Sequence, residues 1–455
     1  MSDTRLASLE AFLDGHPTIK YIPPSSPDYP SKREQWNTGR SDTPLAIVQP
    51  QSAADVSAVV KYAKSQNIDF TIRTGGHNID GKAIVEGALA IDMRAIAFVN
   101  IATDRQAATI GGGILMQDVA TKLGHEGLAT PVGTVPSVGY VGWAMYGGYG
   151  PLSAHWGLGV DQIIGATMIN GDGEVIKADE KLLKGIRGAG GLFGPILDVT
   201  VKIYPLKNVL AGAILFDSKD IAKSLVDYNV GYQKLLDSGL PSELSVQQMV
   251  FNTPTTRLYG ISVMWSSDDF ERGRFWVEKL ACLGIIIANT VSIRNISDWM
   301  ADNGAAVPLN VYGSARTHNL RQITPQVAEI IGHYITEMPS NPATVFSIHQ
   351  LRGPSAAPKQ NSVFATRELH YMLEILGYAT VAEDRGKAEK WGVDFARALE
   401  ESGEGNILPT RYISLDGSDE AHSITRIFGS NTQEVLALKK EYDPNHVFRL
   451  TVPSL

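Results

Sequence analysis

Six consecutive residues, RTGGHN at positions 73–78, place glycines, a cation and an imidazole within one short loop. They follow a strand-like run, and no helix-forming pattern follows them. Adjacent glycines allow a positive φ and let the backbone approach a ligand closely. Successive N–H groups in such a turn can form a nest for a phosphate, with Arg73 adding positive charge and His77 presenting a nucleophilic nitrogen at its edge. Taken alone, the segment is better explained as a tight turn whose histidine satisfies neighbouring backbone groups.

A second stretch, residues 131–150, reads PVGTVPSVGYVGWAMYGGYG and is too rich in glycine for a helix interior. Each glycine there costs about 1 kcal/mol relative to alanine. The functional interpretation is a backbone wall lying flat against a planar ligand that carries a phosphate. The alternative is an ordinary irregular loop. Its position after a possible phosphate nest favours ligand binding without naming the ligand.

One carboxylate, Glu374, lies in the middle of an apolar strand predicted over residues 368–376. Strand periodicity places it on the same face as His370, Met372 and Leu376. A carboxylate at such a position is costly unless it is paired or functional. The alternative, an edge strand with Glu374 pointing to water, fits the periodicity equally well.

Strands and helices in alternation must hold these residues. A strand at 45–48 precedes a helix that begins at Ser52 with a capping-box pattern, and a strand at 68–73 leads into the loop at 73–78. Residues 111–115 start a further helix, in which Leu115, Val119 and Leu123 share a face, and Gly124 is placed as its C-cap. These elements predict helices packed on a sheet.

Three later segments complete the pattern. Residues 160–177 predict a β-hairpin whose turn is rich in Asp and Gly. Residues 411–416 predict a short strand with Tyr412 and Ser414 on one face, and a helix follows residues 428–431. Residues 187–194, RGAGGLFG, resemble a dinucleotide fingerprint, but Phe193 occupies the third glycine position and no clean helix follows. A Rossmann site is therefore not predicted.

Composition narrows the class of protein. The 455 residues predict two or three domains, and 44% apolar with 19% charged residues is typical of a globular protein. A net charge of −8 argues against a nucleic-acid partner, and no apolar run is long enough to span a membrane. The charged N-terminus does not read as a secretory signal, so a cytoplasmic protein is expected. With a single cysteine, Cys282, neither an intramolecular disulfide nor a multi-thiol metal site is possible, no metal is predicted, and the oligomeric state stays open.

Together, five motifs resemble the berberine bridge enzyme-like flavoprotein oxidases of the vanillyl-alcohol oxidase superfamily. They are RTGGHN, the glycine-rich stretch, the Gly171–Gly173 turn, RGAGGLFG and the closing YDPNHVFR at 442–449. The resemblance runs in order over nearly the whole chain. It implies an α+β fold: a PCMH-type FAD-binding domain over 1–205, an inserted substrate domain over 206–405 with an antiparallel sheet backed by helices, and a segment at 406–455 returning to the first domain.

The resemblance also implies FAD as the cofactor, with His77 bonded to the flavin 8α carbon. Many family members carry a second link to a cysteine, but Val135 occupies that position here and Cys282 lies in the other domain. A single covalent link is therefore expected. The residues implied in FAD binding are Arg73, Thr74, Gly75, Gly76, His77, Asn78, Val132, Gly133, Thr134, Ser137, Val138, Gly139, Gly142, Tyr146, Gly148, Gly194, Ile196, Tyr412, Ser414 and Asn431.

Glu374 and Tyr412 match the family's catalytic positions. Under a flavin and apolar side chains, Glu374 is expected to have a raised pKa suited to a general base, with Tyr412 as hydrogen-bond donor or alternative base. Val138 matches the position that gates oxygen access, and a valine there is typical of an oxidase. The implied reaction is hydride transfer from a small alcohol, phenol or secondary-metabolite intermediate to flavin N5, with O₂ reduced to H₂O₂.

Three departures from the family pattern keep other functions open. Ser414, Leu415 and Ile427 replace an asparagine, a tyrosine and an aromatic residue, so the substrate pocket is expected to be less aromatic and less polar than usual. A dehydrogenase with another electron acceptor is one alternative. A non-redox cyclisation in an FAD-shaped pocket is the other.

Overall fold

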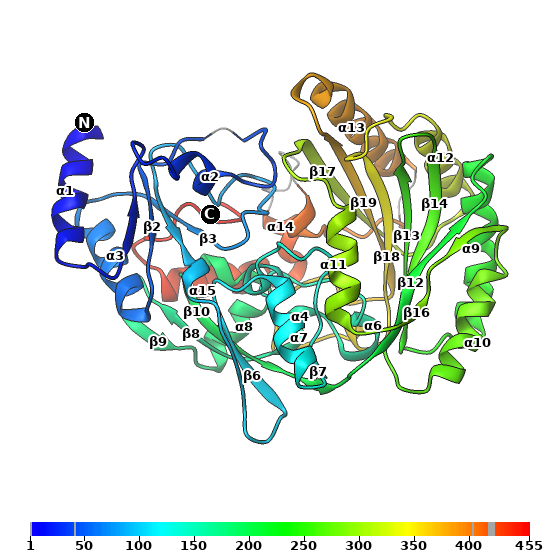
Figure 1. Cartoon of the computed structure of the whole chain (residues 1–455), viewed down its shortest axis with the longest axis horizontal. Helices are drawn as coiled ribbons and strands as arrows, with labels where there is room; N and C mark the ends of the chain where they lie inside the picture. Colours follow the sequence, from blue (N-terminus) through cyan, green and yellow to red (C-terminus); the bar gives the residue numbers. More distant parts are fainter. Residues whose placement is uncertain (1, 41, 403–404, 417–423) are drawn as a thin grey trace.

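The computed structural model describes residues 2–40, 42–402, 405–416 and 424–455, and it forms two lobes (Figure 1). The first lobe holds two small sheets, and the second is built on one large antiparallel sheet. The C-terminal helices return to the first lobe, where Lys439 donates a hydrogen bond to the carbonyl of Leu192 (2.7 Å). The architecture is therefore α+β with the second lobe inserted in the first.

The N-terminal sheet of the first lobe positions the loop at 73–78. Its order is β1-β2-β4-β3, with β2, β4 and β3 parallel. The strands are β1 (Lys20–Ile22), β2 (Ala46–Gln49), β3 (Phe70–Arg73) and β4 (Leu89–Asp92), and the helices are α1 (Ser2–Asp14), α2 (Tyr29–Arg33) and α3 (Ala53–Ser65). Ser52 caps α3 as predicted, because its hydroxyl accepts a hydrogen bond from the Asp55 amide (3.2 Å).

The second sheet of the first lobe has the order β5-β6-β10-β8-β9 and is antiparallel. Its strands are β5 (Val99–Ile101), β6 (Ala107–Gly111), β8 (Ile163–Ile169), β9 (Val175–Lys177) and β10 (Ile196–Lys202), and the helices that share its core are α4 (Met116–His125), α8 (Glu180–Ala189), α14 (Ile424–Phe428) and α15 (Thr432–Tyr442). The predicted hairpin is confirmed as β8 and β9. The predicted C-cap is wrong, since α4 continues past Gly124 and the chain turns at Gly127 (φ 68°).

Further elements of the chain lie outside these two sheets and outside the large sheet of the second lobe. They are β7 (Leu128–Ala129), α5 (Tyr140–Ala144), α6 (Ser153–Trp156), α7 (Gly159–Gln162), β11 (Tyr204–Pro205) and α11 (Ile296–Ala306).

The large sheet of the second lobe has the order β15-β12-β14-β13-β18-β19-β17, with β16 also pairing β12. Its strands are β12 (Val209–Phe216), β13 (Leu244–Asn252), β14 (Arg257–Trp265), β15 (Ile286–Asn289), β16 (Ser292–Arg294), β17 (Tyr312–Leu320), β18 (Val345–Leu351) and β19 (His370–Ala379). Helices α9 (Ile221–Asp237), α10 (Phe270–Ala281), α12 (Pro325–Thr336) and α13 (Arg385–Glu401) cover the face away from the first lobe (Figure 1).

Strand β19 lies between β18 and β17, so it is not an edge strand. Its residues Tyr371, Leu373 and Ile375 pack into the core under the helices, as the alternation predicted. Helix α13 approaches β19 so closely that a Cβ on Gly377 would lie 2.5 Å from the Ala388 carbonyl. Glu374 consequently points from the middle of the sheet toward the first lobe.

The segment after α2 joins the two lobes. The indole of Trp36 donates a hydrogen bond to the Pro308 carbonyl (2.9 Å), and the amide of Asn37 donates one to the Gly313 carbonyl (3.0 Å). Among the helices in the described parts of the chain, none is long and apolar enough to cross a membrane.

Candidate functional site

Arg73 fixes the start of the loop at 73–78. Its guanidinium donates to the carbonyls of Lys32 and Glu34 and lies 3.4 Å from the Asp92 carboxylate. Burial, together with the charge of Arg94, lowers the pKa of Arg73 to about 10. The Nη atoms thus anchor the loop, whereas Nε has no hydrogen-bond partner among the described residues, and a role for this cation in a phosphate nest stays a prediction.

The glycines of the loop at 73–78 allow it to pack closely against residues 137–139. A Cβ on Gly75 would lie 2.5 Å from the Ser137 carbonyl oxygen, and one on Gly139 would lie 2.6 Å from the Thr74 side chain. Gly76 has φ 72°, which favours glycine. The absence of side chains at Gly75 and Gly139 thus lets two loops of the protein meet, whereas the sequence suggested close approach to a ligand.

His77 is held by two neighbours from outside its loop. Its Nε2 lies 2.8 Å from the Ser137 hydroxyl, and its ring stacks on Trp36 with centroids 5.7 Å apart. Burial, with a smaller effect of the Arg73 charge, lowers the pKa of His77 to about 4. The imidazole is therefore neutral at physiological pH, which is the nucleophilic form. The neighbouring Asn78 accepts a hydrogen bond from the Lys82 amide (2.9 Å).

Most glycines of the predicted backbone wall pack against the protein itself. A Cβ on Gly133 would touch the Trp143 indole at 3.1 Å, and Gly148 (φ 81°) lies against Gly159. Gly194 (φ 136°) lies against the Ile169 carbonyl. Gly142 differs, because apart from its own helix and chain neighbours no heavy atom of the described residues comes within 4 Å of a Cβ built on it. The prediction of one continuous wall is thus too broad, and the open position is Gly142 on α5.

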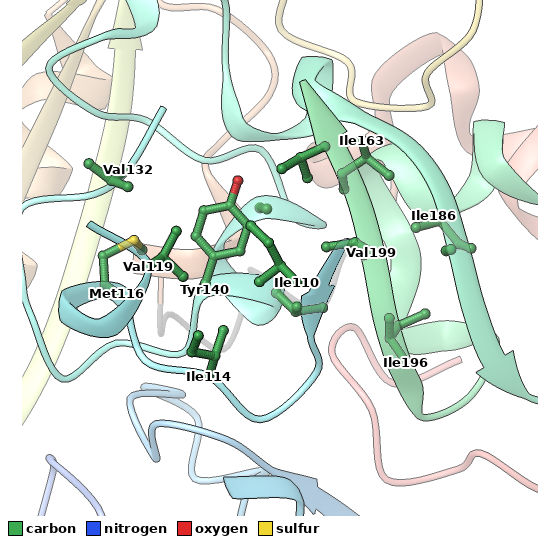
Figure 2. Packing of buried hydrophobic residues seen from close by; sticks show 14 of the residues in the cluster. Ile110, Ile114, Met116, Val119, Val132, Tyr140, Ile163, Ile186, Ile196 and Val199 are labelled. Carbon is green, nitrogen blue, oxygen red and sulfur yellow. The ribbon is translucent and has the colours of Figure 1, made fainter. Parts of the chain in front are cut away.

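The remaining cofactor candidates of the first lobe divide into buried and half-buried side chains. Val132 and Ile196 point into the core of the lobe (Figure 2), so only their backbones are available to a ligand. Thr134, Val138 and Tyr146 are half-buried. The Val138 carbonyl accepts a hydrogen bond from the Met116 amide (2.9 Å), which fixes this residue in the loop.

Glu374 lies in a polar cluster on the open face of the large sheet. Its Oε2 accepts a hydrogen bond from the Ser347 hydroxyl (2.5 Å) and lies 3.2 Å from His349 Nε2. Burial acts to raise the pKa of Glu374, but the hydrogen bond and charge of His349 and the Ser347 hydroxyl outweigh it, and the pKa is lowered. The predicted raised pKa is therefore wrong, and Glu374 is an anion near neutral pH.

Tyr412 lies between the two lobes, but not on the predicted strand. Residues 413–415 form a short 3₁₀ helix, and the Tyr412 amide lies 3.3 Å from the Thr317 hydroxyl. The Tyr412 hydroxyl accepts a hydrogen bond from the Gly148 amide (3.2 Å) and interacts with Ser414. Burial raises the pKa of Tyr412, so its hydroxyl is a hydrogen-bond donor and not a ready base.

Contacts bring the predicted segments together. Trp36 stacks on His77 and also meets Tyr378 of β19 with ring centroids 4.9 Å apart. Tyr149, from the glycine-rich stretch, lies 4.6 Å from the Tyr412 ring and 6.4 Å from the His349 ring, measured between centroids. The loops at 73–78 and 131–150, strand β19 and Tyr412 therefore surround one region. Asn431 donates to the carbonyl of Val363 (3.1 Å), the residue before Phe364, whose ring centroid lies 6.4 Å from that of Tyr149.

Sequence reasoning missed several residues of this region. Ser347 and His349 alternate on β18, which was predicted as a strand, so its period would have placed both on one face. Trp36 carried no such signal, because it belongs to a loop. In the described part of the chain, no group of three or more His, Cys, Asp or Glu side chains is placed to hold a metal ion.

Comparisons with known proteins agree with this arrangement. A family model described as an FAD binding domain matches residues 44–179. The FAD-linked oxidoreductase aurO of Gibberella zeae is 31% identical to this chain, over 97% of the chain and 87% of the relative. The (R)-6-hydroxynicotine oxidase of Paenarthrobacter nicotinovorans is 27% identical, over 91% of this chain and 92% of the relative.

The fold has close counterparts among solved structures. One is the glucooligosaccharide oxidase of Acremonium strictum, whose description concerns the functional roles of its 6-S-cysteinyl, 8α-N1-histidyl FAD. It superposes with a TM-score of 0.84 at 17% identity, over 97% of each chain. The two-lobed FAD-oxidase fold inferred from the sequence is thereby confirmed.

Proposed function

Because this chain belongs to the berberine bridge enzyme-like FAD-linked oxidoreductases, we propose that it is an oxidase of a small organic substrate. The substrate is an alcohol, a phenol or an intermediate of secondary metabolism. Bound FAD supplies a hydride acceptor at N5 and passes the electrons to O₂, which gives H₂O₂. The division into domains at 1–205, 206–405 and 406–455 is part of the same proposal.

The environment of His77 carries this proposal. A neutral imidazole is held at the joint of the two lobes by Ser137 and Trp36. Since Ser137 engages Nε2, Nδ1 is the nitrogen available for a bond to the flavin 8α carbon. The open position at Gly142 leaves room beside α5 that a larger side chain would fill. These features fit a flavin that is attached to one histidine.

A second covalent attachment is not expected. Val135 stands where a cysteine would be needed. The one thiol of the chain, Cys282, is exposed at the end of α10 in the second lobe. The other residues that we propose to hold FAD lie in the segments at 73–78 and 132–148, at Gly194 and Ile196, and at Tyr412, Ser414 and Asn431.

Glu374 is the proposed base. It is ionised near neutral pH, so it can accept a proton from a substrate hydroxyl as hydride leaves the adjacent carbon. Tyr412 donates a hydrogen bond to the substrate oxygen, a role that suits a phenol whose pKa is raised by burial. At physiological pH the proposed base, Glu374, is therefore charged, and the proposed hydrogen-bond donor, Tyr412, is neutral.

Reoxidation of the flavin tests the oxidase function without knowledge of the substrate. Flavin in the purified protein is reduced with dithionite and mixed in a stopped-flow instrument with O₂ or with a quinone. We expect rapid reoxidation by O₂ with formation of H₂O₂. Reoxidation that is slow in O₂ and rapid with the quinone would overturn the oxidase function in favour of a dehydrogenase.

A further inference from the structure

The carboxylate of Glu374 belongs to a side-chain cluster that spans three strands. Its members are Gln247 on β13, Ser347 and His349 on β18, and Glu374 on β19. The register of the sheet places Ser347 directly opposite Glu374 and Gln247 directly opposite His349. Side chains paired in this way lie on one face of the sheet, close enough to interact.

The two carboxylate oxygens of Glu374 differ in their hydrogen-bond partners. Oε2 receives the Ser347 hydroxyl at 2.5 Å and the His349 ring nitrogen at 3.2 Å. Gln247 Nε2 lies 3.1 Å from the same nitrogen of His349 and 3.4 Å from the Ser347 hydroxyl. Within the described residues Oε1 has no hydrogen-bond partner. One oxygen is therefore fixed by the protein, and the other is available to a substrate.

The contact between His349 and Glu374 is strong because both side chains are largely buried. The side chains of His349 and Glu374 are 16% and 12% exposed, so solvent screens their interaction only weakly. An ionised carboxylate at this depth needs hydrogen-bond donors to offset its loss of water. Ser347 and His349 supply them.

Building on the proposed function, we propose that His349 is a positioning residue for Glu374. It holds Oε2, with Ser347 as the second donor, and so leaves Oε1 available to a substrate O–H or N–H. The substrate class is therefore one with a proton-bearing oxygen or nitrogen next to the carbon that is oxidised. The proton moves from that heteroatom to Oε1, and the hydride goes to the flavin.

The other titratable groups around the pair are uncharged near neutral pH. Burial raises the pKa values of Tyr149, Tyr412 and Tyr378. Burial also lowers the pKa of His370, which bonds to the Tyr149 hydroxyl, to about 4. Among the charged groups nearby, Arg367 pairs with Asp161, and Asp80, Arg40 and Arg316 act on the pKa of Tyr378. His349 is therefore the neighbour whose removal changes the carboxylate most.

Titration of the Glu374 carboxyl tests this role without a substrate. The flavin-loaded protein is labelled with ¹³C at the glutamate carboxyl carbon, and Glu374→Gln assigns the resonance. We expect His349→Ala to raise the pKa of Glu374 by about one unit, since a donor to the anion is lost. His349→Gln, which can still donate a hydrogen bond, should raise it less, and Ser347→Ala should also raise it.

The matched control is His155→Ala. His155 is also half-buried and bonded to a serine hydroxyl, that of Ser266 (2.9 Å), but it lies on α6. This change should leave the Glu374 resonance where it is. A Glu374 titration unchanged by His349→Ala would overturn the proposal, and if that variant does not fold, an unchanged titration in His349→Gln decides the same way. A protein that binds no flavin would instead contradict the proposed function.

Discussion

At the scale of single residues, the site depends on partners from distant parts of the sequence. In the proposed function Glu374 and His77 carry the chemistry, and both were identified as candidates from the sequence. Their partners Ser347, His349 and Trp36 could not be identified, because strand register and a loop contact bring them there. The predicted direction of the Glu374 pKa shift was wrong for this reason. Burial was predicted correctly, but the two hydrogen-bond donors that outweigh it, His349 and Ser347, were not.

Ser137 offers the first prediction at this scale. Its hydroxyl engages His77 Nε2, so Ser137→Ala frees the ring to rotate and to present either nitrogen. We expect covalent attachment of FAD to the freshly prepared apoprotein to slow several-fold, measured as flavin that stays with the acid-precipitated protein over time. Ser266→Ala removes a comparable serine–histidine contact, that with His155, and should not change the rate. An unchanged rate in Ser137→Ala would show that this hydroxyl does not orient the imidazole.

At the scale of elements, regular structure was more predictable than irregular structure. The cap of α3, the β8–β9 hairpin and the alternating faces of β19 follow from local pattern and agree with the structure. The segment at 411–416 was predicted as a strand from alternation over six residues. It instead turns, since the Leu415 amide bonds back to the Tyr412 carbonyl (3.1 Å). Alternation over so short a run cannot exclude a turn.

Gly75 and Gly142 both lie in glycine-rich segments, but their surroundings differ, and so do the expected effects of replacing them. Gly75 meets the backbone of residues 137–139, so Gly75→Ala should destabilise the protein by about 1–3 kcal/mol. Gly142 faces open space, so Gly142→Leu should keep the melting temperature of the flavin-free protein but prevent FAD binding. Thermal unfolding and the flavin-to-protein absorbance ratio distinguish the two effects. Normal flavin content in Gly142→Leu would remove this helix from the cofactor site.

At the scale of the whole molecule, the two-lobed order was predictable from motifs spread along the chain. The contacts that join the lobes were not, because Trp36 and Asn37 lie in a loop without periodicity. The packing of the glycine-rich stretch was equally hard to predict. Composition indicates glycine density, but only the packed molecule shows that most of these glycines meet other parts of the protein.

Buried histidines make the folded protein less stable in acid. Burial lowers the pKa of His370 to about 4 and that of His318 to about 3, below the value of about 6.5 in an unfolded chain. Between these values the unfolded chain binds more protons, so the free energy of unfolding falls as the pH drops from about 6.5 toward 4. Urea unfolding at several pH values measures this slope. His370→Gln should make the slope shallower, whereas a change at the exposed His333 should not; equal slopes in all three proteins would contradict this account.

The covalent attachment of FAD to His77 is the central claim, and acid precipitation tests it most directly. The purified protein is denatured in acid and centrifuged, and the yellow colour of pellet and supernatant is compared for wild type and His77→Ala. We predict colour in the wild-type pellet and none in the His77→Ala pellet. Colour released into the wild-type supernatant would contradict the covalent link, and a colourless protein that FAD cannot reconstitute would contradict the FAD-binding site described here.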